Sequence, residues 1–147
     1  MVRRHTPSLS FEVFPPNPAV GNDKIFQALR EMQDLAPHFI SVTASNNKFD
    51  IEETTVRLTE FIANELQIPT IAHLPAVYLT KDMVSNILQS LDRVGVHQIL
   101  ALRGDIFPDV APKDDFTFAT DLIEYIKTEA PHFDIIGACY PEGHPAS

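Results

Sequence analysis

The stretch Ile99-Leu-Ala-Leu-Arg-Gly-Asp105 predicts a short buried strand that ends abruptly in charged residues. A run of four apolar residues is typical of such a strand. Arg103 is a permanent cation, Gly104 permits a tight or left-handed backbone, and Asp105 is an anion two positions beyond the arginine. A strand that ends in this way indicates a functional site at its carboxyl end. Taken alone, the same tripeptide also fits an Arg–Asp surface pair that closes an ordinary strand-to-helix turn.

On both sides of this stretch, strand and helix patterns alternate about every 30 residues. Asn22 and Thr80 are expected to cap helices, and Gly95 is expected to end one. The predicted strands cover residues 8–14, 38–43, 69–74, 97–102 and 133–139, and the predicted helices cover 22–35, 51–66, 80–95 and 116–128. The apolar residues expected on the buried faces of the helices are Ile25, Leu29, Met32, Val56, Leu58, Ile62, Val84, Ile87, Leu88, Leu91, Phe118, Leu122 and Ile126.

This alternation predicts an α/β fold with a parallel sheet and right-handed crossovers. Two architectures fit, an open doubly wound sheet and a (β/α)8 TIM-barrel type of which this chain would contain only about five βα units. Pro15-Pro16 follows the first strand, where a dinucleotide-binding Rossmann fold would place a glycine-rich phosphate loop. We expect residues 1–147 to form a single domain.

Composition limits the possible functions. The chain has 147 residues, of which 44% are hydrophobic, which is enough for a core. Its 11 basic and 20 acidic residues give a net charge of −9, which argues against binding to nucleic acid or to anionic membranes. A single cysteine, Cys139, fits a reducing cytoplasm and is expected to be a small buried residue. We see no signal peptide or transmembrane segment and expect a soluble cytoplasmic protein.

Polar residues occur where each predicted strand ends, which is where a barrel places its active site. They are Glu12 in the first strand, Thr43 at the end of the second, His73 near the end of the third, Arg103 and Asp105 at the end of the fourth, and Tyr140, Glu142 and His144 after the fifth.

Several of these residues also have simpler explanations. Glu12 could be a solvated residue of an edge strand, and His73 a hydrogen-bonded histidine of the core. Thr43 is by default a β-branched strand residue, and Tyr140 and His144 could pack a turn made by the nearby prolines. If the barrel closes, however, Glu12 points inward, where burial would favour the protonated carboxyl of a general acid.

The chain resembles the methylenetetrahydrofolate reductases, which are flavoenzymes with a (β/α)8 barrel. The segments that match in order and spacing are Ser10-Phe-Glu-Val-Phe-Pro-Pro16, Ser41-Val-Thr43, Ala72-His-Leu74, Ile99-Leu-Ala-Leu-Arg-Gly-Asp105, Phe118-Ala-Thr-Asp-Leu122, and Phe133 through Tyr140-Pro-Glu-Gly-His-Pro145. The resemblance covers nearly the whole chain and makes it the N-terminal portion of such a barrel.

The resemblance implies reduction of 5,10-methylenetetrahydrofolate to 5-methyltetrahydrofolate. NADH or NADPH would reduce FAD, and the flavin would then pass a hydride to folate. Glu12 matches the general acid that protonates a folate nitrogen so that the five-membered ring opens. Asp105 matches a carboxylate near flavin and pterin. The positions that match FAD-binding residues are Thr43, His73, Arg103, Gly104, Asp105, Phe118, Ala119, Tyr140 and His144.

The chain departs from the family pattern in two places. Where the family usually has Tyr-Gly-Ala-Gly-Gly after the second strand, this sequence has Ala44-Ser-Asn-Asn-Lys48, which removes an aromatic ring and three glycines. The chain also ends before the family's sixth strand. We therefore expect part of a longer protein, a barrel completed by a C-terminal segment of another chain or by a homo-oligomer, or a non-catalytic remnant.

Two other functions remain open. The chain could bind flavin or another subunit without turnover. Alternatively, Glu12, His73, Asp105 and His144 could hold a divalent ion in a barrel hydrolase or aldolase. The sequence has no close His-x-His or two-cysteine spacing to support that second alternative, so we predict no metal site.

Overall fold

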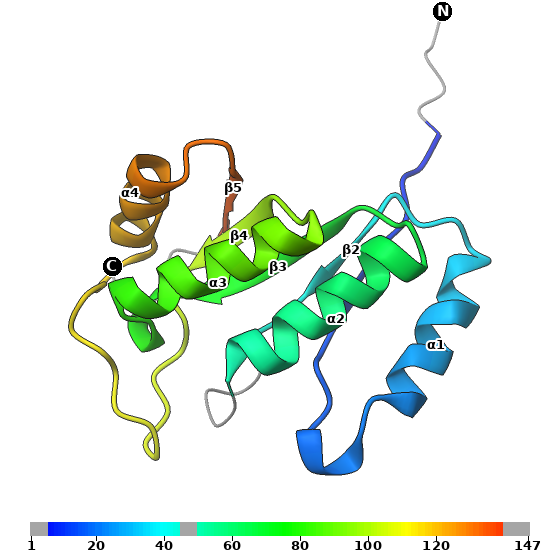
Figure 1. Ribbon diagram of the computed structural model, residues 1–147, viewed down its shortest axis with the longest axis horizontal. Coiled ribbons are helices and arrows are strands. Elements are labelled where there is room, and N and C mark those ends of the chain that lie inside the picture. Colours follow the sequence, from blue (N-terminus) through cyan, green and yellow to red (C-terminus); the bar gives the residue numbers. More distant parts are fainter. Residues whose placement is uncertain (1–5, 45–49, 140–147) are drawn as a thin grey trace, which may run out of the picture.

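Five parallel strands form one sheet in the computed structural model, which describes residues 6–44 and 50–139. The strands pair in chain order, each with the next one along the sequence (Figure 1). They are β1 (Ser10–Val13), β2 (Phe39–Val42), β3 (Thr70–Pro75), β4 (Gln98–Leu102) and β5 (Asp134–Gly137). All five strands coincide with predicted ones to within a few residues at each end.

Helical segments connect successive strands. They are α1 (Asp23–Gln33), α2 (Arg57–Glu60), α3 (Lys81–Val94) and α4 (Ala119–Glu129). The π-helical turns Glu52–Val56 and Phe61–Glu65 flank α2. The predicted helix over 51–66 is therefore present as one continuous helical segment whose two ends are π-helical. Short 3-10 turns cover Pro18–Val20 and Ala76–Tyr78.

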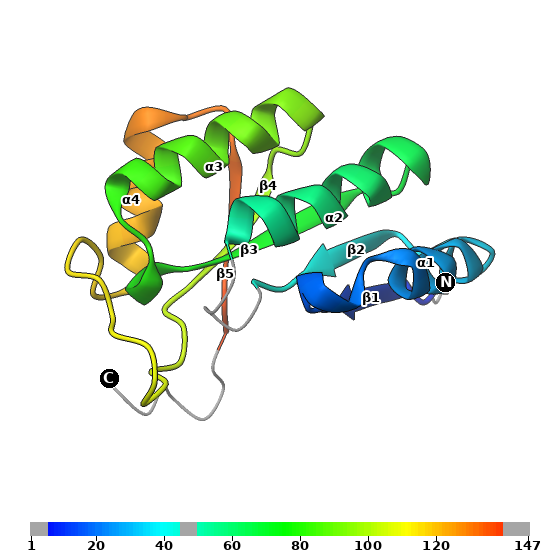
Figure 2. The ribbon, with the colours of Figure 1, turned by 60° about the horizontal axis from the view of Figure 1, so that its bottom comes forward.

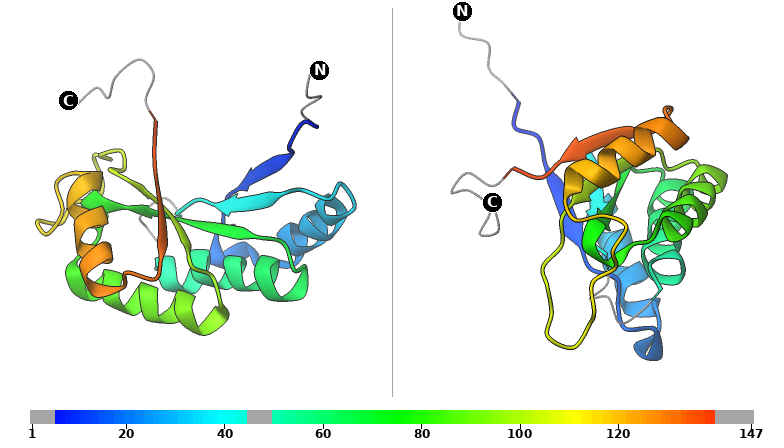
Figure 3. Two further views of the ribbon diagram at one scale, coloured as in Figure 1. Left: turned by 90° about the horizontal axis from the view of Figure 1, so that it is seen from above. Right: turned by 90° about the vertical axis from the view of Figure 1, so that its left-hand side faces the viewer.

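The strand order excludes the doubly wound alternative. In a doubly wound sheet the order reverses at a switch point, whereas here it runs from β1 to β5 without reversal. The helices accordingly lie on one face of the described sheet, which curves away from them (Figure 3). This arrangement is consistent with part of a TIM-barrel-like fold.

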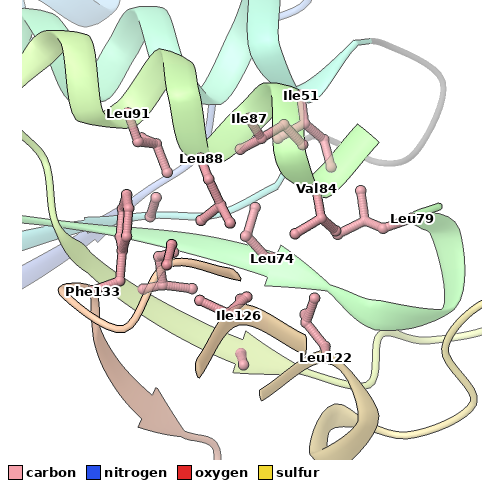
Figure 4. Close-up of a cluster of buried hydrophobic side chains, with 14 of the residues drawn as sticks. Ile51, Leu74, Leu79, Val84, Ile87, Leu88, Leu91, Leu122, Ile126 and Phe133 are labelled. Atoms are coloured by element: carbon pink, nitrogen blue, oxygen red, sulfur yellow. The ribbon is translucent and has the colours of Figure 1, made fainter. Parts of the chain in front are cut away.

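The core lies between the sheet and its helices. On β3 and β4 the alternate residues Ala72, Leu74, Ile99 and Ala101 pack against the buried faces of α3 and α4 (Figure 4). A second cluster packs α1 and the α2 run against β1 and β2. Of the predicted helix-face residues, all but Phe118 lie in or against these two clusters.

The predicted caps have different outcomes. The Thr80 hydroxyl accepts a hydrogen bond from the Met83 N–H at 3.2 Å, and Gly95 ends α3 in the left-handed conformation with φ 77°, so both predictions for this helix are confirmed. Asn22 precedes α1, but its side chain makes no capping hydrogen bond because its own backbone is already near-helical, with φ −97° and ψ −4°. Asn22 is thus the residue at which the helix begins, as predicted, but its side chain does not cap the helix.

The last helix begins three residues later than predicted. The Asp121 carboxylate accepts hydrogen bonds from the backbone N–H groups of Thr117 and Phe118, at 3.0 and 2.8 Å, and thereby fixes the start of α4 at Ala119. Phe118 consequently precedes the helix and is 48% exposed, so its predicted place on the buried face was wrong.

Two findings concern the surface of the described residues. Within 6–44 and 50–139, no helix is long and apolar enough to cross a membrane. Cys139 is exposed, contrary to the predicted burial, because it follows the last residue of β5 rather than lying within the strand.

Candidate functional site

Among the described residues, three buried polar atoms at the carboxyl-end edge of the sheet lack hydrogen-bond partners. They are Thr43 Oγ1, His73 Nε2 and Arg103 Nε, from the second, third and fourth strands or the residues that follow them. A buried polar atom left unpaired costs about 1–3 kcal/mol, and such atoms are rare in native proteins. Three of them on consecutive strands indicate that this edge is built to contact a further group.

His73 and Glu12 approach each other across the strand between them. His73 Nε2 on β3 lies 3.9 Å from Glu12 Oε2 on β1, and β2 between them contributes Ser41 as the register partner of Glu12. Burial lowers the pKa of the His73 imidazole, and the Glu12 carboxylate opposes that shift. His73 is therefore a neutral imidazole at physiological pH, and its Nε2 lacks the hydrogen bond that a core histidine would have.

Glu12 points to the face of the sheet opposite the helices, because neighbouring strand residues alternate and Phe11 and Val13 pack against the helices. Its side chain is nevertheless 55% exposed. The burial that would favour a protonated carboxyl is thus not present in the described residues, because β1 is an edge strand and the concave face of the sheet is open there.

Gly104 is required at its position by two independent constraints. Its φ is 89°, a left-handed conformation that side chains other than glycine rarely adopt. A Cβ atom there would also lie 2.9 Å from Pro75 Cβ and 3.2 Å from Val77 Cγ2. The backbone between Arg103 and Asp105 can therefore pack closely against the end of β3.

Tyr78 organises the loop after β4, and the sequence analysis missed this residue. Its hydroxyl donates to the Asp105 carbonyl and accepts from the Phe107 N–H, both at 2.8 Å. Two further hydrogen bonds tie the Ala76–Tyr78 turn to the loop, from the Val77 N–H to the Arg103 carbonyl at 3.0 Å and from the Lys113 N–H to the Val77 carbonyl at 2.7 Å. Figure 2 shows this long loop, in yellow-green, beside the carboxyl ends of the strands. A buried tyrosine, whose hydroxyl needs a partner, is the signal that could have identified it.

The structure brings some of the predicted site residues together and leaves others apart. Glu12 with His73, and Gly104 with the end of β3, are in contact. Asp105 and Phe118 are exposed, and Ala119 opens α4 at the same edge. Tyr140, Glu142 and His144 lie outside the described residues, as does most of the departing loop, residues 45–49.

Three of the four residues of the ion-binding set expected for a hydrolase or aldolase lie in the described residues, and the fourth, His144, lies outside them. Within the described ranges, Glu12, His73 and Asp105 do not form a group whose ligand atoms could meet on one ion. The group that does is Asp92, His97 and His132. Hydrogen bonds from His97 and His132 lower the pKa of Asp92. These three residues lie at the amino ends of β4 and β5, which is the edge of the sheet opposite the site described above.

The described residues form a βα-repeat sheet in the strand order β1 to β5, and in α/β proteins built this way ligand sites generally lie at the carboxyl ends of the strands. A family described as methylenetetrahydrofolate reductase matches residues 1–147 in sequence. The chain belongs to the methylenetetrahydrofolate reductase family.

Curated relatives agree with this assignment. The chain is 35% identical over 139 residues to a 5,10-methylenetetrahydrofolate reductase of Buchnera aphidicola, covering 94% of this chain and 46% of the relative. It is 30% identical over 138 residues to the Escherichia coli protein of the same name, covering 94% and 45%. A probable methylenetetrahydrofolate reductase (NADH) of Oryza sativa is 32% identical over 147 residues, with 92% and 24% covered. The chain thus spans less than half the length of these relatives.

Proposed function

We propose that this chain forms the flavin-holding portion of an enzyme that reduces 5,10-methylenetetrahydrofolate to 5-methyltetrahydrofolate with NADH or NADPH. Family membership supports the reaction, and the name of the Oryza relative includes NADH. The observation that most supports a bound cofactor is the set of three unpartnered buried polar atoms along one edge of the sheet.

The chemistry of these atoms fits a flavin nucleotide. Thr43 offers a hydroxyl, His73 a neutral imidazole nitrogen, and Arg103 a guanidinium of the kind that binds phosphate. Gly104 keeps the backbone close to β3, and Ala119 opens a helix at the same edge. In our proposal Thr43, His73, Arg103, Gly104, Asp105, Phe118 and Ala119 hold FAD, together with Tyr140 and His144. When bound, the flavin supplies the hydride transfer.

The chain's own acid–base chemistry is assigned to Glu12. We propose that its carboxyl donates a proton to a folate nitrogen, and that His73, 3.9 Å away, positions it. That role requires a drier environment than the described residues provide, because Glu12 is half-exposed. Bound folate and flavin, and the barrel units that the longer relatives contain, would cover this carboxyl.

A titration of the purified chain with FAD, followed by visible absorbance, tests the proposal. We expect saturable uptake of one flavin per chain. Replacing Arg103 or His73 by alanine removes one ligand-facing polar group each, which should weaken binding by about tenfold, equivalent to about 1.4 kcal/mol.

Matched controls are His38→Ala and Arg57→Ala, which remove an exposed histidine and an exposed arginine from other parts of the surface. Both should bind FAD like the unaltered chain. If a chain that unfolds cooperatively takes up no flavin, or if the control variants lose binding as much as the site variants, the proposal is wrong.

A binding role without turnover is a second candidate, which the exposure of Glu12 favours. It predicts flavin uptake by the chain without any folate reduction. Detectable reduction of 5,10-methylenetetrahydrofolate by the chain alone would exclude it.

A further inference from the structure

Two histidines and an aspartate meet at the amino-end edge of the sheet. Asp92 lies in the last turn of α3, His97 immediately precedes β4, and His132 lies just before β5. His97 Nε2 is 2.7 Å from Asp92 Oδ1, and His132 Nε2 is 3.2 Å from the same oxygen. The three possible ligand atoms all lie within 4.8 Å of one another.

Two backbone features of the fold fix this arrangement. The left-handed turn at Gly95 reverses the chain after α3 and returns His97 toward Asp92, five residues earlier. The Asp134 N–H donates to the His97 carbonyl at 2.9 Å, which sets β5 beside β4 and places His132 next to His97.

Phe133 holds both imidazole rings. It is buried in the core shared by α3, α4 and β4 (Figure 4), and its ring centroid lies 5.4 Å from that of His97 and 4.8 Å from that of His132. The two imidazoles also pack edge to face, with centroids 5.6 Å apart. Ligand side chains that are held before an ion arrives lose little rotamer freedom when it binds.

We propose that Asp92, His97 and His132 form a binding site for a divalent transition-metal ion, with zinc or nickel as the best-matched ions. Two imidazole nitrogens and one carboxylate oxygen are ligands that these ions accept. A zinc ion with bonds of about 2.1 Å separates its ligand atoms by about 3.0–3.5 Å. The observed separations of 2.7 and 3.2 Å from Oδ1 need only small adjustments of exposed side chains.

Binding requires one rearrangement of protons. Each imidazole must present the Nε2 lone pair to the metal, with its remaining proton on Nδ1, and the Asp92 oxygen must exchange its hydrogen bonds for a metal bond. Solvent water would complete the coordination, since the side chains of Asp92, His97 and His132 are 48%, 43% and 53% exposed. The site differs in residues and in place from the predicted ion set of Glu12, His73, Asp105 and His144.

Calorimetric titration of the tag-free chain with zinc chloride, and separately with nickel chloride, tests the proposal. We expect one ion per chain. His97→Ala and His132→Ala should each weaken binding by at least tenfold, and excess zinc should raise the Tm of the unaltered chain but not of these variants. Asp92→Asn, which keeps the size of the side chain but loses its charge, should weaken binding as well.

His38→Ala is the matched control, because His38 is an exposed histidine that precedes β2 at the same edge of the sheet. Cys139→Ser controls for the exposed thiol. Both should bind zinc like the unaltered chain. Failure of the unaltered chain to bind either ion would overturn the proposal. Binding of zinc by His97→Ala and His132→Ala as tightly as by the unaltered chain would overturn it as well. FAD uptake by these variants should be unchanged, which separates this site from the proposed cofactor site.

Discussion

At the scale of single residues, the burial of His73 links the stability of the fold to pH. Burial lowers the pKa of this imidazole in the folded chain, with Glu12 opposing the shift, so the unfolded chain binds a proton more readily than the folded one. The free energy of unfolding should therefore fall as the pH drops below about 6.5, the ordinary histidine value, toward the lowered value of the folded chain. The loss from this one group cannot exceed about 1.4 kcal/mol per pH unit.

Urea unfolding followed by circular dichroism at pH 7.5, 6.5 and 5.5 would measure this effect. His73→Gln has no proton to gain in this range, so its stability should fall less steeply than that of the unaltered chain. His38→Gln removes an exposed histidine and should keep the original slope. A His73→Gln variant with the same slope as the unaltered chain would contradict the assignment of this pH dependence to His73.

At the scale of elements, the junction between β4 and its following loop depends on Gly104. Alanine there would have to adopt a φ of 89° and would place its Cβ 2.9 Å from Pro75 Cβ. Left-handed strain of about 1–2 kcal/mol and overpacking of about 1–3 kcal/mol add to an expected destabilisation of about 2–5 kcal/mol. Thermal or urea unfolding of Gly104→Ala gives this value directly.

Gly95→Ala separates the two contributions. Gly95 has nearly the same backbone, with φ 77°, but a Cβ there would meet nothing within 4 Å. We expect it to be destabilised by the strain alone, about 1–2 kcal/mol. If the two variants lose equal free energy of unfolding, the close packing of Gly104 against the end of β3 adds nothing to the cost of the Gly104 substitution. The Arg103–Asp105 backbone is then not packed tightly against β3.

Helix ends that are fixed by residues close by in the sequence could be predicted from the sequence. Thr80 and Gly95 fix the ends of α3 through hydrogen bonds and a left-handed turn that depend only on neighbouring residues. The start of α4 was not predicted, because an aspartate three residues inside the helix, Asp121, competes with the apolar spacing that includes Phe118. Glu12 and Val13 lie on opposite faces of β1, as neighbouring residues of a strand do.

Contacts between distant segments could be predicted only in part. The sequence placed His73 at the right edge of the sheet, because parallel strands bring their carboxyl ends together. It could not show that His73 Nε2 lacks a partner, which depends on packing across three strands. The Asp92–His97–His132 group escaped prediction because its last two members are 35 residues apart and meet only through the pairing of β4 with β5.

At the scale of the whole molecule, the helices cover one face of the sheet and the described residues leave the other face open (Figure 3). Neighbouring residues of β5 test this arrangement. Ile135 packs against the main core, while Ile136 faces the concave side and is 40% exposed. Ile135→Lys should destabilise the chain by about 2 kcal/mol, because it removes an apolar side chain packed against the main core and places a charge there. Ile136→Lys should change the free energy of unfolding by less than about 0.5 kcal/mol.

Urea unfolding of both variants, with size-exclusion chromatography of each, distinguishes an open concave face from a covered one. If Ile136→Lys is as destabilising as Ile135→Lys, then something covers the concave face in solution. A change in elution volume for Ile136→Lys would identify the cover as a second copy of the chain. If only Ile135→Lys is destabilised, the five strands and their helices are stable as a one-sided sheet, because the free energy of folding then comes from the convex side alone.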